Sequence, residues 1–331
     1  MIYVHGAGHF HPENVIDNRF LEDLDIGCDA TWTLERVGIA TRRTVLPLDY
    51  IRSTKNGNVV AANEAALYSN AETGAFASEM AIKRAGILRS EIGMVISGSC
   101  TPQFSVPAEA CTIAEKLGIE AYSFDISSAC TSFLAQLNYL NTVKPECLPD
   151  YVLLVCPENN TRVIDYADRS AAVLWGDATS AMVVSTKIKS RMSFSQVVMN
   201  SSPAGWDAVK VPFGKHFVQS GRTVQTFAIK KSVGLIRGLR EGLSFEKNAS
   251  LKYIGHQANY LMLESVCKLA EISPQSHFSN VQDYGNTGAA GAPTVLSQNW
   301  DTWKSGDVIV FALVGAGLTW GGSLVQVGEG K

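Results

Sequence analysis

Four segments from the first half of the chain return, in the same order, in the second half. The first series is MVISGSC, DISSACTSF, DYVLLVCPEN and GDATSAMVVS, and the second is KYIGHQAN, DYGNTGAAGAP, GDVIVFALVGAG and TWGGSLVQVG. Each series is typical of a strand with a loop, a strand that leads into a helix, and a hairpin. Chance explains one such match more easily than four in one order, so the repeat predicts two similar halves, 1–186 and 187–331. Matching loops of the two halves would then face each other across a pseudo-twofold axis.

Apolar, β-rich segments alternate with helical ones, which predicts an α/β protein whose sheets are covered by helices. The expected strands are Ile2–Ala7, Gly93–Ser97, Ala121–Ile126, Tyr151–Cys156, Ala181–Ser185, Tyr253–Gly255, Val308–Val314 and Gly322–Val327. The expected helices are Gly74–Ala85, Pro107–Leu117, Cys130–Thr142, Ala228–Leu243 and Met262–Ala270. The polar stretch 46–73 is expected to be an irregular excursion that covers something or contributes to a dimer. The Gly-, Pro- and Ser-rich stretch 201–222 is expected to be a mobile flap between the halves.

Composition excludes several classes of function. With 28 Lys and Arg against 31 Asp and Glu, the net charge of −3 provides no basic surface for nucleic acid. No apolar run reaches the roughly 18 residues of a membrane span. The seven cysteines form no C-x-x-C pair and no metal-like spacing, so reduced thiols in the cytoplasm fit best. His9 and His11 stand close together, but no nearby set of carboxylates or cysteines would complete a metal site.

Cys130 differs from the other six cysteines in its surroundings. It follows a short apolar strand and the small residues SSA, where a helix is expected to begin. The unpaired N–H groups and partial positive charge of a helix N-terminus favour the thiolate over the thiol, whose ordinary pKa is about 8.5. A tight turn of small residues also lets a substrate approach. A buried cysteine is usually inert packing, but this context makes Cys130 a candidate nucleophile.

Two further residues suit chemistry with such a thiolate. His256 follows a short strand in GHQAN, and Asn286 lies in YGNTGAAGAP. Taken singly, the histidine could be a buried group bonded to backbone, and the asparagine a turn residue beside glycine. Taken together, cysteine and histidine suit acyl transfer, and a histidine–asparagine pair of hydrogen-bond donors suits an enolate oxygen. The Gly-rich VGAGLTWGGSLV could add backbone N–H groups, although alone it reads as a β-turn; no phosphate-binding or dinucleotide motif occurs.

These segments together resemble the thiolase-like condensing enzymes, and most closely the β-ketoacyl-acyl-carrier-protein synthase III family. SSACTSF, GHQAN, YGNTGAA and GAGLTWGG are similar to four of its motifs, and TWTLERVGIATRR and DRSAAVLWGDATSAMVV to two more. The resemblance runs over nearly the whole chain. It implies a five-layer αβαβα fold of two duplicated halves, usually a homodimer, with a Cys-His-Asn active site.

The resemblance also implies roles for single residues. Cys130 would accept the acyl group, and His256 and Asn286 would bind the thioester carbonyl of the second substrate. The backbone N–H groups of Cys130 and Ala316 would form the oxyanion hole. Ala316 stands where the family often has Gly, and the role survives if the backbone geometry does, because the donor is main chain.

An entrance for coenzyme A is implied in the same way. Trp32, Arg36 and Arg169 match the Trp and two Arg that the family uses there, and Asn259 would also bind substrate. Taken singly, each arginine is about as well explained as a surface residue paired with a carboxylate. The substrates would be coenzyme A or phosphopantetheine thioesters, and no metal or redox cofactor is expected.

Two departures from the family pattern concern the substrates. Tyr260 and Leu261 stand where the family commonly has Leu-Arg, and that arginine helps to dock the acyl carrier protein. Docking would then use other basic residues, namely Lys268, Arg237 or Arg240, unless the last two form only a solvated helix face. Val106 stands where the family often has a Phe that reaches across the dimer and limits the acyl pocket. With Phe104, Val106 is expected to line a pocket open to medium or long acyl chains.

The sequence therefore predicts a condensing enzyme that loads an acyl group on Cys130. A Claisen condensation with a malonyl-type or β-ketoacyl thioester would follow, in fatty-acid or specialised lipid or polyketide biosynthesis. The long 46–73 stretch resembles relatives that make dialkylresorcinol-type lipids. The alternatives are an acyltransferase that forms an ester or amide, a hydrolase, and a non-catalytic partner subunit of a condensing heterodimer.

Overall fold

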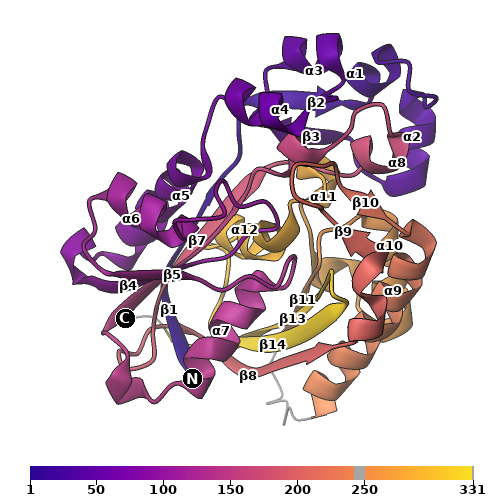
Figure 1. The fold of residues 1–331 in the computed structure, drawn as a ribbon. Coiled ribbons are helices and arrows are strands. Elements are labelled where there is room, and N and C mark those ends of the chain that lie inside the picture. The colour runs from indigo at the N-terminus through magenta and orange to yellow at the C-terminus, as the bar shows by residue number, and fades with distance from the viewer. Residues whose placement is uncertain (242–249, 330–331) are drawn as a thin grey trace.

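The fold is built around one large sheet, seen in a computed structural model that describes residues 1–241 and 250–329 (Figure 1). Its ten strands, in spatial order, are β12 (His277–Phe278), β11 (Ser250–Gly255), β13 (Asp307–Gly315), β14 (Thr319–Val327), β8 (Met192–Ser201), β1 (Ile2–Phe10), β7 (Ala178–Ser185), β6 (Tyr151–Glu158), β4 (Ile92–Ser97) and β5 (Tyr122–Asp125). Two short antiparallel pairs lie apart from it: β2 (Asn14–Asp17) with β3 (Thr41–Thr44), and β9 (Val209–Lys210) with β10 (Val218–Gln219).

The large sheet consists of two sets of five strands with the same order and directions. β1, β7 and β6 are antiparallel neighbours, and β6, β4 and β5 are parallel neighbours. The set β8, β14, β13, β11, β12 repeats this pattern pair by pair. The sets join where β1 pairs with β8 and Ile2 lies opposite Phe194. The topology thus carries the duplication that the repeated segments predict. The division expected after residue 186 falls between β7 and β8 and stays a prediction.

Helices cover both outer sides of the sheet and fill the space between its two sets (Figure 1). The helices are α1 (Asn18–Asp23), α2 (Ala30–Val37), α3 (Leu48–Thr54), α4 (Val59–Ala65), α5 (Asn70–Ala85), α6 (Glu109–Leu117), α7 (Ser132–Thr142), α8 (Arg169–Ala172), α9 (Gly221–Glu241), α10 (Tyr260–Ala270), α11 (Val281–Tyr284) and α12 (Gly291–Gln298). α5 and α6 pack on the first set, and α9 and α10 on the second. α7 contacts β6 and β8, and α12 contacts β1 and β11, so each central helix touches both sets. This is the five-layer thiolase-like fold that the sequence predicts.

The core follows from these layers. A central cluster joins Phe133 and Leu137 of α7 to Val295 and Leu296 of α12, all nearly inaccessible to solvent. A further apolar cluster lies under α5 and α6 of the first set, and another lies under α9 and α10 of the second set. Burying each side chain of this size contributes about 1.5–3 kcal/mol. The two central helices are therefore fixed firmly, and the loops at their N-termini are fixed with them.

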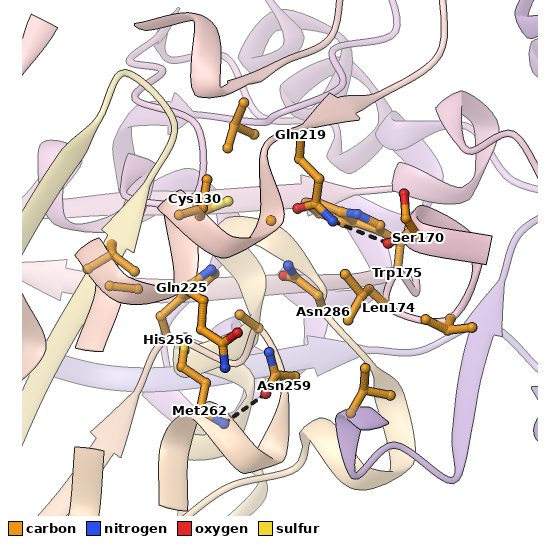
Figure 2. Close-up of a pocket in the computed structure, with 18 of the residues that line it drawn as sticks. Cys130, Ser170, Leu174, Trp175, Gln219, Gln225, His256, Asn259, Met262 and Asn286 are labelled. Atoms are coloured by element: carbon orange, nitrogen blue, oxygen red, sulfur yellow. Dashed lines mark hydrogen bonds between the residues drawn. The ribbon is translucent and has the colours of Figure 1, made fainter. Parts of the chain in front are cut away.

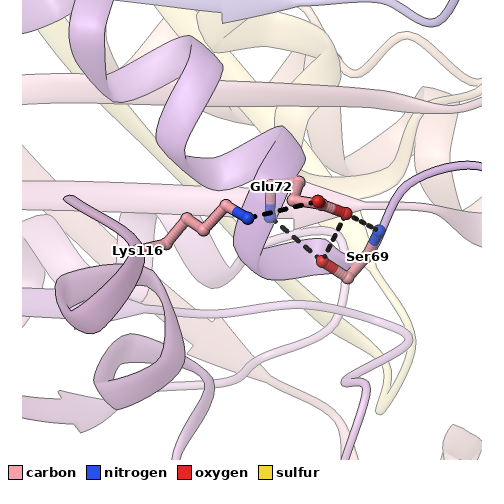
Figure 3. A network of polar contacts seen from close by, with 3 residues as sticks. All are labelled: Ser69, Glu72 and Lys116. Carbon is pink, nitrogen blue, oxygen red and sulfur yellow. Dashed lines mark hydrogen bonds and ion pairs between the residues drawn. The ribbon is translucent and has the colours of Figure 1, made fainter.

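The outer helix α5 illustrates how the sequence sets such packing. A Cβ atom added at Gly8 of β1 would lie 1.9 Å from the carbonyl oxygen of Ala77, so only glycine permits this close approach of helix and strand. α5 begins with a capping box, in which Ser69 accepts the Glu72 N–H and Glu72 accepts the Ser69 N–H (Figure 3). Glu72 also pairs with Lys116 of α6 at 3.2 Å, as Figure 3 shows.

All the expected strands and helices correspond to observed ones, with shifts at their ends. Residues 242–243 of the expected helix Ala228–Leu243 lie outside the described residues. The interpretation of 46–73 as irregular is wrong, because the stretch contains α3, α4 and the start of α5. α3 and α4 are short, with seven residues each, and α4 is capped by the polar side chain of Asn58, which accepts the Val60 and Ala61 N–H groups.

The stretch 201–222 contains a 3₁₀ turn, Pro203–Ala208, and the pair β9–β10. Its mobility stays a prediction. Across the described part of the chain, no helix combines the length and apolarity that crossing a membrane requires.

Candidate active site

Cys130 lies between β5 and α7, two residues before the helix begins. The turn is held by Ser132, whose Oγ accepts the Ser128 N–H at 2.9 Å and donates to the Ala129 carbonyl at 2.6 Å. Ala129 has a φ of 47°, an unusual backbone conformation for a residue with a side chain. Such strain is often found at functional turns. The result is a buried cysteine, 6% exposed, held at the N-terminal end of a central helix.

A second thiol lies beside this one. The Sγ atoms of Cys100 and Cys130 are 3.8 Å apart. A hydrogen bond from Cys100 and one from His256 both lower the pKa of Cys130, and together they outweigh the effect of burial, so the pKa lies well below the ordinary value. The bond to Cys130, and then burial, raise the pKa of Cys100 in turn. Cys130 is therefore the thiol of the two that ionises, as a nucleophile requires.

His256 and Asn286 come from the second half of the chain. His256 directly follows β11, and its backbone N–H donates to the backbone carbonyl of Ala312 in β13 at 3.1 Å. The Asn286 N–H donates to the Leu174 carbonyl at 2.8 Å, and its Oδ1 accepts the Gly288 N–H at 3.1 Å. Because Oδ1 is engaged in this way, Nδ2 is the Asn286 group left for a substrate. Both side chains are buried, each 6% exposed.

One cavity of about 540 Å³ brings these residues together (Figure 2). Cys130, His256 and Asn286 all line it, although the first half of the chain supplies one and the second half supplies two. All five of the other residues expected around the same substrate line it as well: Trp32, Arg36, Arg169, Asn259 and Ala316. The structure thus places eight of the ten expected site residues around a single space.

The entrance residues are arranged by contacts of their own. The Arg169 guanidinium lies over the Trp32 ring, 5.1 Å from its centre, and donates to the Gly27 carbonyl. Trp32 and Arg36 stand one turn apart on α2, which Asp29 caps. Asn259 is the N-cap of α10, with its Oδ1 accepting the Met262 N–H at 2.8 Å. That bond gives Asn259 a structural role in addition to its position at the cavity.

The turn between β13 and β14 brings backbone close to the nucleophile. A Cβ atom added at Gly315 would lie 3.2 Å from the Cys130 nitrogen, so a side chain there would crowd the backbone that carries the nucleophile. The hydroxyl groups of Thr319 and Thr131 are hydrogen-bonded at 2.8 Å, and the Thr319 hydroxyl also lies within 3.0 Å of the Ala316 carbonyl oxygen, to which it donates. Ala316 follows Gly315 and lines the same cavity as Cys130, and the oxyanion hole that the two would share stays a prediction.

A smaller cavity of about 120 Å³ adjoins Cys130 and is lined mainly by apolar residues. Cys100, Val163, Ile164, Trp175 and Phe217 are among them. Phe104 and Val106 line neither cavity of the single chain; they are 54% and 82% exposed. Their place in an acyl pocket stays a prediction, because it depends on a second chain.

Sequence reasoning missed two residues near the nucleophile, Cys100 and Glu158. The Glu158 carboxylate at the end of β6 is fully buried and accepts the N–H groups of Cys100 and Ala289, at 3.0 Å each for the closest oxygen. Burial, and then the charge of Cys130, raise the pKa of Glu158 to about 8. A carboxylate directly after the apolar run YVLLVCP was the signal that could have indicated a buried acid.

The remaining expectations concern two arginines that could dock a carrier protein and two histidines considered as metal ligands. Arg237 and Arg240 donate to the Leu269 and Ala270 carbonyls, 3.0 Å each, so they cap the end of α10. The His9 ring is hydrogen-bonded to the Ser297 hydroxyl, and the His11 ring stacks on the Tyr284 ring. Within residues 1–241 and 250–329, no three His, Cys, Asp or Glu side chains are grouped to hold a metal ion.

A fold of two duplicated halves, with cysteine, histidine and asparagine around one cavity, defines the class of thiolase-like condensing enzymes. The 3-oxoacyl-[acyl-carrier-protein] synthase III model matches residues 124–203, and the model of the C-terminal part of that synthase matches residues 246–327. The chain belongs to the 3-oxoacyl-acyl-carrier-protein synthase III family, and it is a condensing enzyme of the acyltransferase class.

Individual relatives agree with this assignment. The chain is 29% identical to the β-ketoacyl-[acyl-carrier-protein] synthase III of Aliarcobacter butzleri, over 98% of each chain. It is 29% identical to the 3-oxopimeloyl-[acyl-carrier-protein] synthase of Brucella abortus, over 97% of each chain. The crystal structure of the 3-oxoacyl-[acyl-carrier-protein] synthase III of Aquifex aeolicus superposes with a TM-score of 0.86, at 26% identity, over 98% of this chain and 100% of that one.

Proposed function

We propose that Cys130 accepts an acyl group from a thioester, and that the enzyme then joins this group to a malonyl-type or β-ketoacyl thioester. The observation that carries the proposal is the single cavity at which Cys130 meets His256 and Asn286. Acylation needs the first of these residues, and carbanion formation needs the other two. A cavity of about 540 Å³ has room for a pantetheine arm and the reacting groups.

The acylation step begins with the Cys130 thiolate, which attacks the carbonyl carbon of the acyl thioester. The carbonyl oxygen becomes an oxyanion, and the backbone N–H groups of Cys130 and Ala316 stabilise it. The bond between the carbonyl carbon and the carrier sulfur then breaks, and the carrier leaves as a thiol after taking up a proton. The acyl group remains on Cys130 as a new thioester.

The condensation step uses His256 and Asn286. Both donate hydrogen bonds to the thioester carbonyl of the second substrate, so that an enolate can form when a malonyl group loses CO₂. The enolate carbon attacks the acyl carbon on Cys130, and a carbon–carbon bond forms as the carbon–sulfur bond breaks. Cys130 leaves as a thiolate and is ready for another acyl group.

The substrates are proposed to reach the cavity as coenzyme A or carrier-protein thioesters. Trp32, Arg36 and Arg169 offer an aromatic face and two cations at the cavity, which suit a nucleotide and its phosphates. The named relatives are acyl-carrier-protein synthases, which supports a carrier protein as one partner. Lys268 on α10 is the basic residue kept for docking, since the guanidinium groups of Arg237 and Arg240 bind backbone carbonyls.

The acyl group is proposed to be of medium or long length, as in fatty-acid or specialised lipid biosynthesis. The apolar cavity of about 120 Å³ beside Cys130 provides room beyond an acetyl group. The proposed homodimer would cover the exposed Phe104 and Val106 and extend the pocket without an aromatic ring at position 106. Sedimentation that returned the mass of one chain would contradict the dimer. The unpaired cysteines fit a reducing compartment such as the cytoplasm.

The test is a comparison of acyl donors in the full reaction. The purified enzyme receives octanoyl- or acetyl-coenzyme A, followed by malonyl-coenzyme A or malonyl carrier protein, and release of CO₂ and of a β-ketoacyl thioester is followed. We expect both products, with octanoyl donor favoured. A clear preference for acetyl donor would refute the chain-length proposal. Acyl transfer to an alcohol or amine without loss of CO₂ would favour the alternative of an ester- or amide-forming acyltransferase.

A further inference from the structure

Two thiols meet in the active site, and the reaction proposed above uses only one of them. The Cys100 and Cys130 Sγ atoms are 3.8 Å apart, within hydrogen-bond range for sulfur, and both residues line the cavity of about 120 Å³. Cys100 follows β4, and Cys130 precedes α7, so the contact joins two loops of the first half. None of the seven cysteines is in a disulfide.

Cys100 is held in place from behind. Its backbone N–H donates to both oxygens of the buried Glu158 carboxylate, at 3.1 and 3.0 Å. The neighbouring Ser99 hydroxyl donates to the same carboxylate at 3.3 Å and accepts the Thr101 N–H at 2.9 Å. Glu158 is itself fixed by the N–H of Ala289, which lies in the 3₁₀ turn Gly288–Ala290 just before α12. These bonds fix the backbone at Cys100, and from that backbone its Sγ reaches the Cys130 Sγ.

The two thiols differ in their protonation: Cys100 stays a neutral thiol, and Cys130 ionises to the thiolate. A thiol is a weak hydrogen-bond donor, but donation to a charged acceptor is stronger than donation to a neutral one. Because Cys130 is buried, such a bond also gains from the low local dielectric. The bond to Cys130 and then burial favour the neutral form of Cys100, whereas Cys130 receives hydrogen bonds from both Cys100 and His256, so Cys100 keeps its proton while Cys130 gives up its own.

We propose that Cys100 is a catalytic residue whose thiol proton hydrogen-bonds the Cys130 thiolate before acylation and again when the thiolate re-forms after condensation. The inference rests on the proposed function of Cys130. No bond of Cys100 breaks in either step, and its proton stays on its own sulfur throughout. What Cys100 adds is stabilisation of negative charge on the neighbouring sulfur.

Other titratable groups face Cys130 from the elements packed around it. His256 approaches from the end of β11 and also favours the thiolate, and Glu158 approaches from the end of β6. Arg36 of α2 and Arg169 of α8 line the same large cavity. The test therefore changes Cys100 alone and reads the ionisation of Cys130 directly.

The experiment measures the alkylation rate of Cys130 by iodoacetamide as a function of pH, with peptide mass mapping to separate the seven cysteines. Wild type is compared with Cys100→Ala, which removes the donor, and Cys100→Ser, which replaces it by a hydroxyl. Cys267→Ala is the matched control, because Cys267 is a buried thiol of α10 that lines neither cavity. Circular dichroism establishes that each variant is folded.

We expect Cys100→Ala to raise the pH midpoint of Cys130 alkylation by about one pH unit, which lowers the rate about tenfold on the acid side. Cys100→Ser and Cys267→Ala should keep a midpoint close to wild type. An unchanged midpoint in Cys100→Ala, with Cys130 selectively reactive in wild type, would overturn this inference and leave the proposed function standing. So would a serine variant shifted as far as the alanine variant. A wild-type Cys130 that is not selectively alkylated would overturn both proposals.

Discussion

The two steps of the proposed reaction divide between residues of the two halves. Cys130 belongs to the first half and is proposed to carry the acyl group, and His256 and Asn286 belong to the second half and are proposed to act on the extender. Because the Asn286 side chain can donate only through Nδ2, which is proposed to bind the extender carbonyl, its loss should affect carbanion formation and spare acyl transfer to Cys130. The roles can therefore be separated experimentally.

We expect Asn286→Ala to lower malonyl decarboxylation about 10²–10³-fold, the typical effect of removing one donor to a developing oxyanion. Loading of Cys130 should stay within a few-fold of wild type. Both steps are measured on one preparation. Decarboxylation is measured as CO₂ release, and loading of Cys130 as the intact mass after mixing with acyl-coenzyme A. Asn299→Ala is the control, since the Asn299 side chain only bonds to the Val295 carbonyl. Equal losses in both steps would contradict the division of roles.

Single residues were predictable where a local motif carries them. SSAC, GHQAN and YGNTG each mark their residue by the turn or strand beside it, and the structure brings Cys130, His256 and Asn286 to one cavity. Cys100 and Glu158 carry no such mark. Cys100 gains its importance only because β4 and the turn before α7 bring two sulfurs together across the fold. Glu158 gains its importance from the N–H groups of two distant segments.

At the scale of elements, α5 depends on its first turn. The Ser69 side chain accepts the Glu72 N–H, and the Glu72 side chain accepts the Ser69 N–H, while Lys116 pairs with Glu72 where both are partly exposed (Figure 3). A capping hydroxyl usually stabilises more than an exposed ion pair does, because the ion pair is screened by water. The two contacts on one carboxylate should therefore differ in their effect on stability.

We expect Ser69→Ala to lower the free energy of unfolding by about 1 kcal/mol, and Lys116→Met to lower it by less than about 0.5 kcal/mol. Urea denaturation followed by circular dichroism measures both values. Ser53→Ala serves as the control, because the Ser53 hydroxyl only donates to carbonyls of its own exposed helix. A loss for Lys116→Met that equals or exceeds that for Ser69→Ala would show that the ion pair, and not the cap, fixes the start of α5.

Elements were predictable in proportion to how fully they are buried. β6 and β7 are nearly inaccessible to solvent and contain the apolar runs VLLVC and AMVV, which mark them in the sequence. β8 escaped prediction because only its first three residues are buried and because three serines, a glutamine and an asparagine interrupt its apolar residues. α3 and α4 escaped for a related reason, since each buries only one or two side chains. The small pairs β2–β3 and β9–β10 are too short for a pattern to appear.

At the scale of the whole molecule, the duplicated topology explains why the site lies where it does. α7 and α12 occupy equivalent positions in the two sets of strands, and both lie in the central layer (Figure 1). Cys130 precedes the first helix, and Asn286 precedes the 3₁₀ turn that leads into the second. The pseudo-twofold arrangement thus brings the two loops to the same space, as the repeated segments predict. The repeat could not predict the volume of that space, which depends on side chains such as Phe217, Gln225 and Phe227.

The central claim is that the two halves converge on Cys130 as the acyl acceptor. The most direct test mixes the enzyme with octanoyl-coenzyme A, quenches it in acid, and determines the intact mass and the labelled peptide. The account predicts one octanoyl group per chain, attached to Cys130, and none in Cys130→Ala, with Cys111→Ala as the control because Cys111 is an exposed thiol. A label that persists in Cys130→Ala, or a wild-type chain that takes up no acyl group, would contradict it.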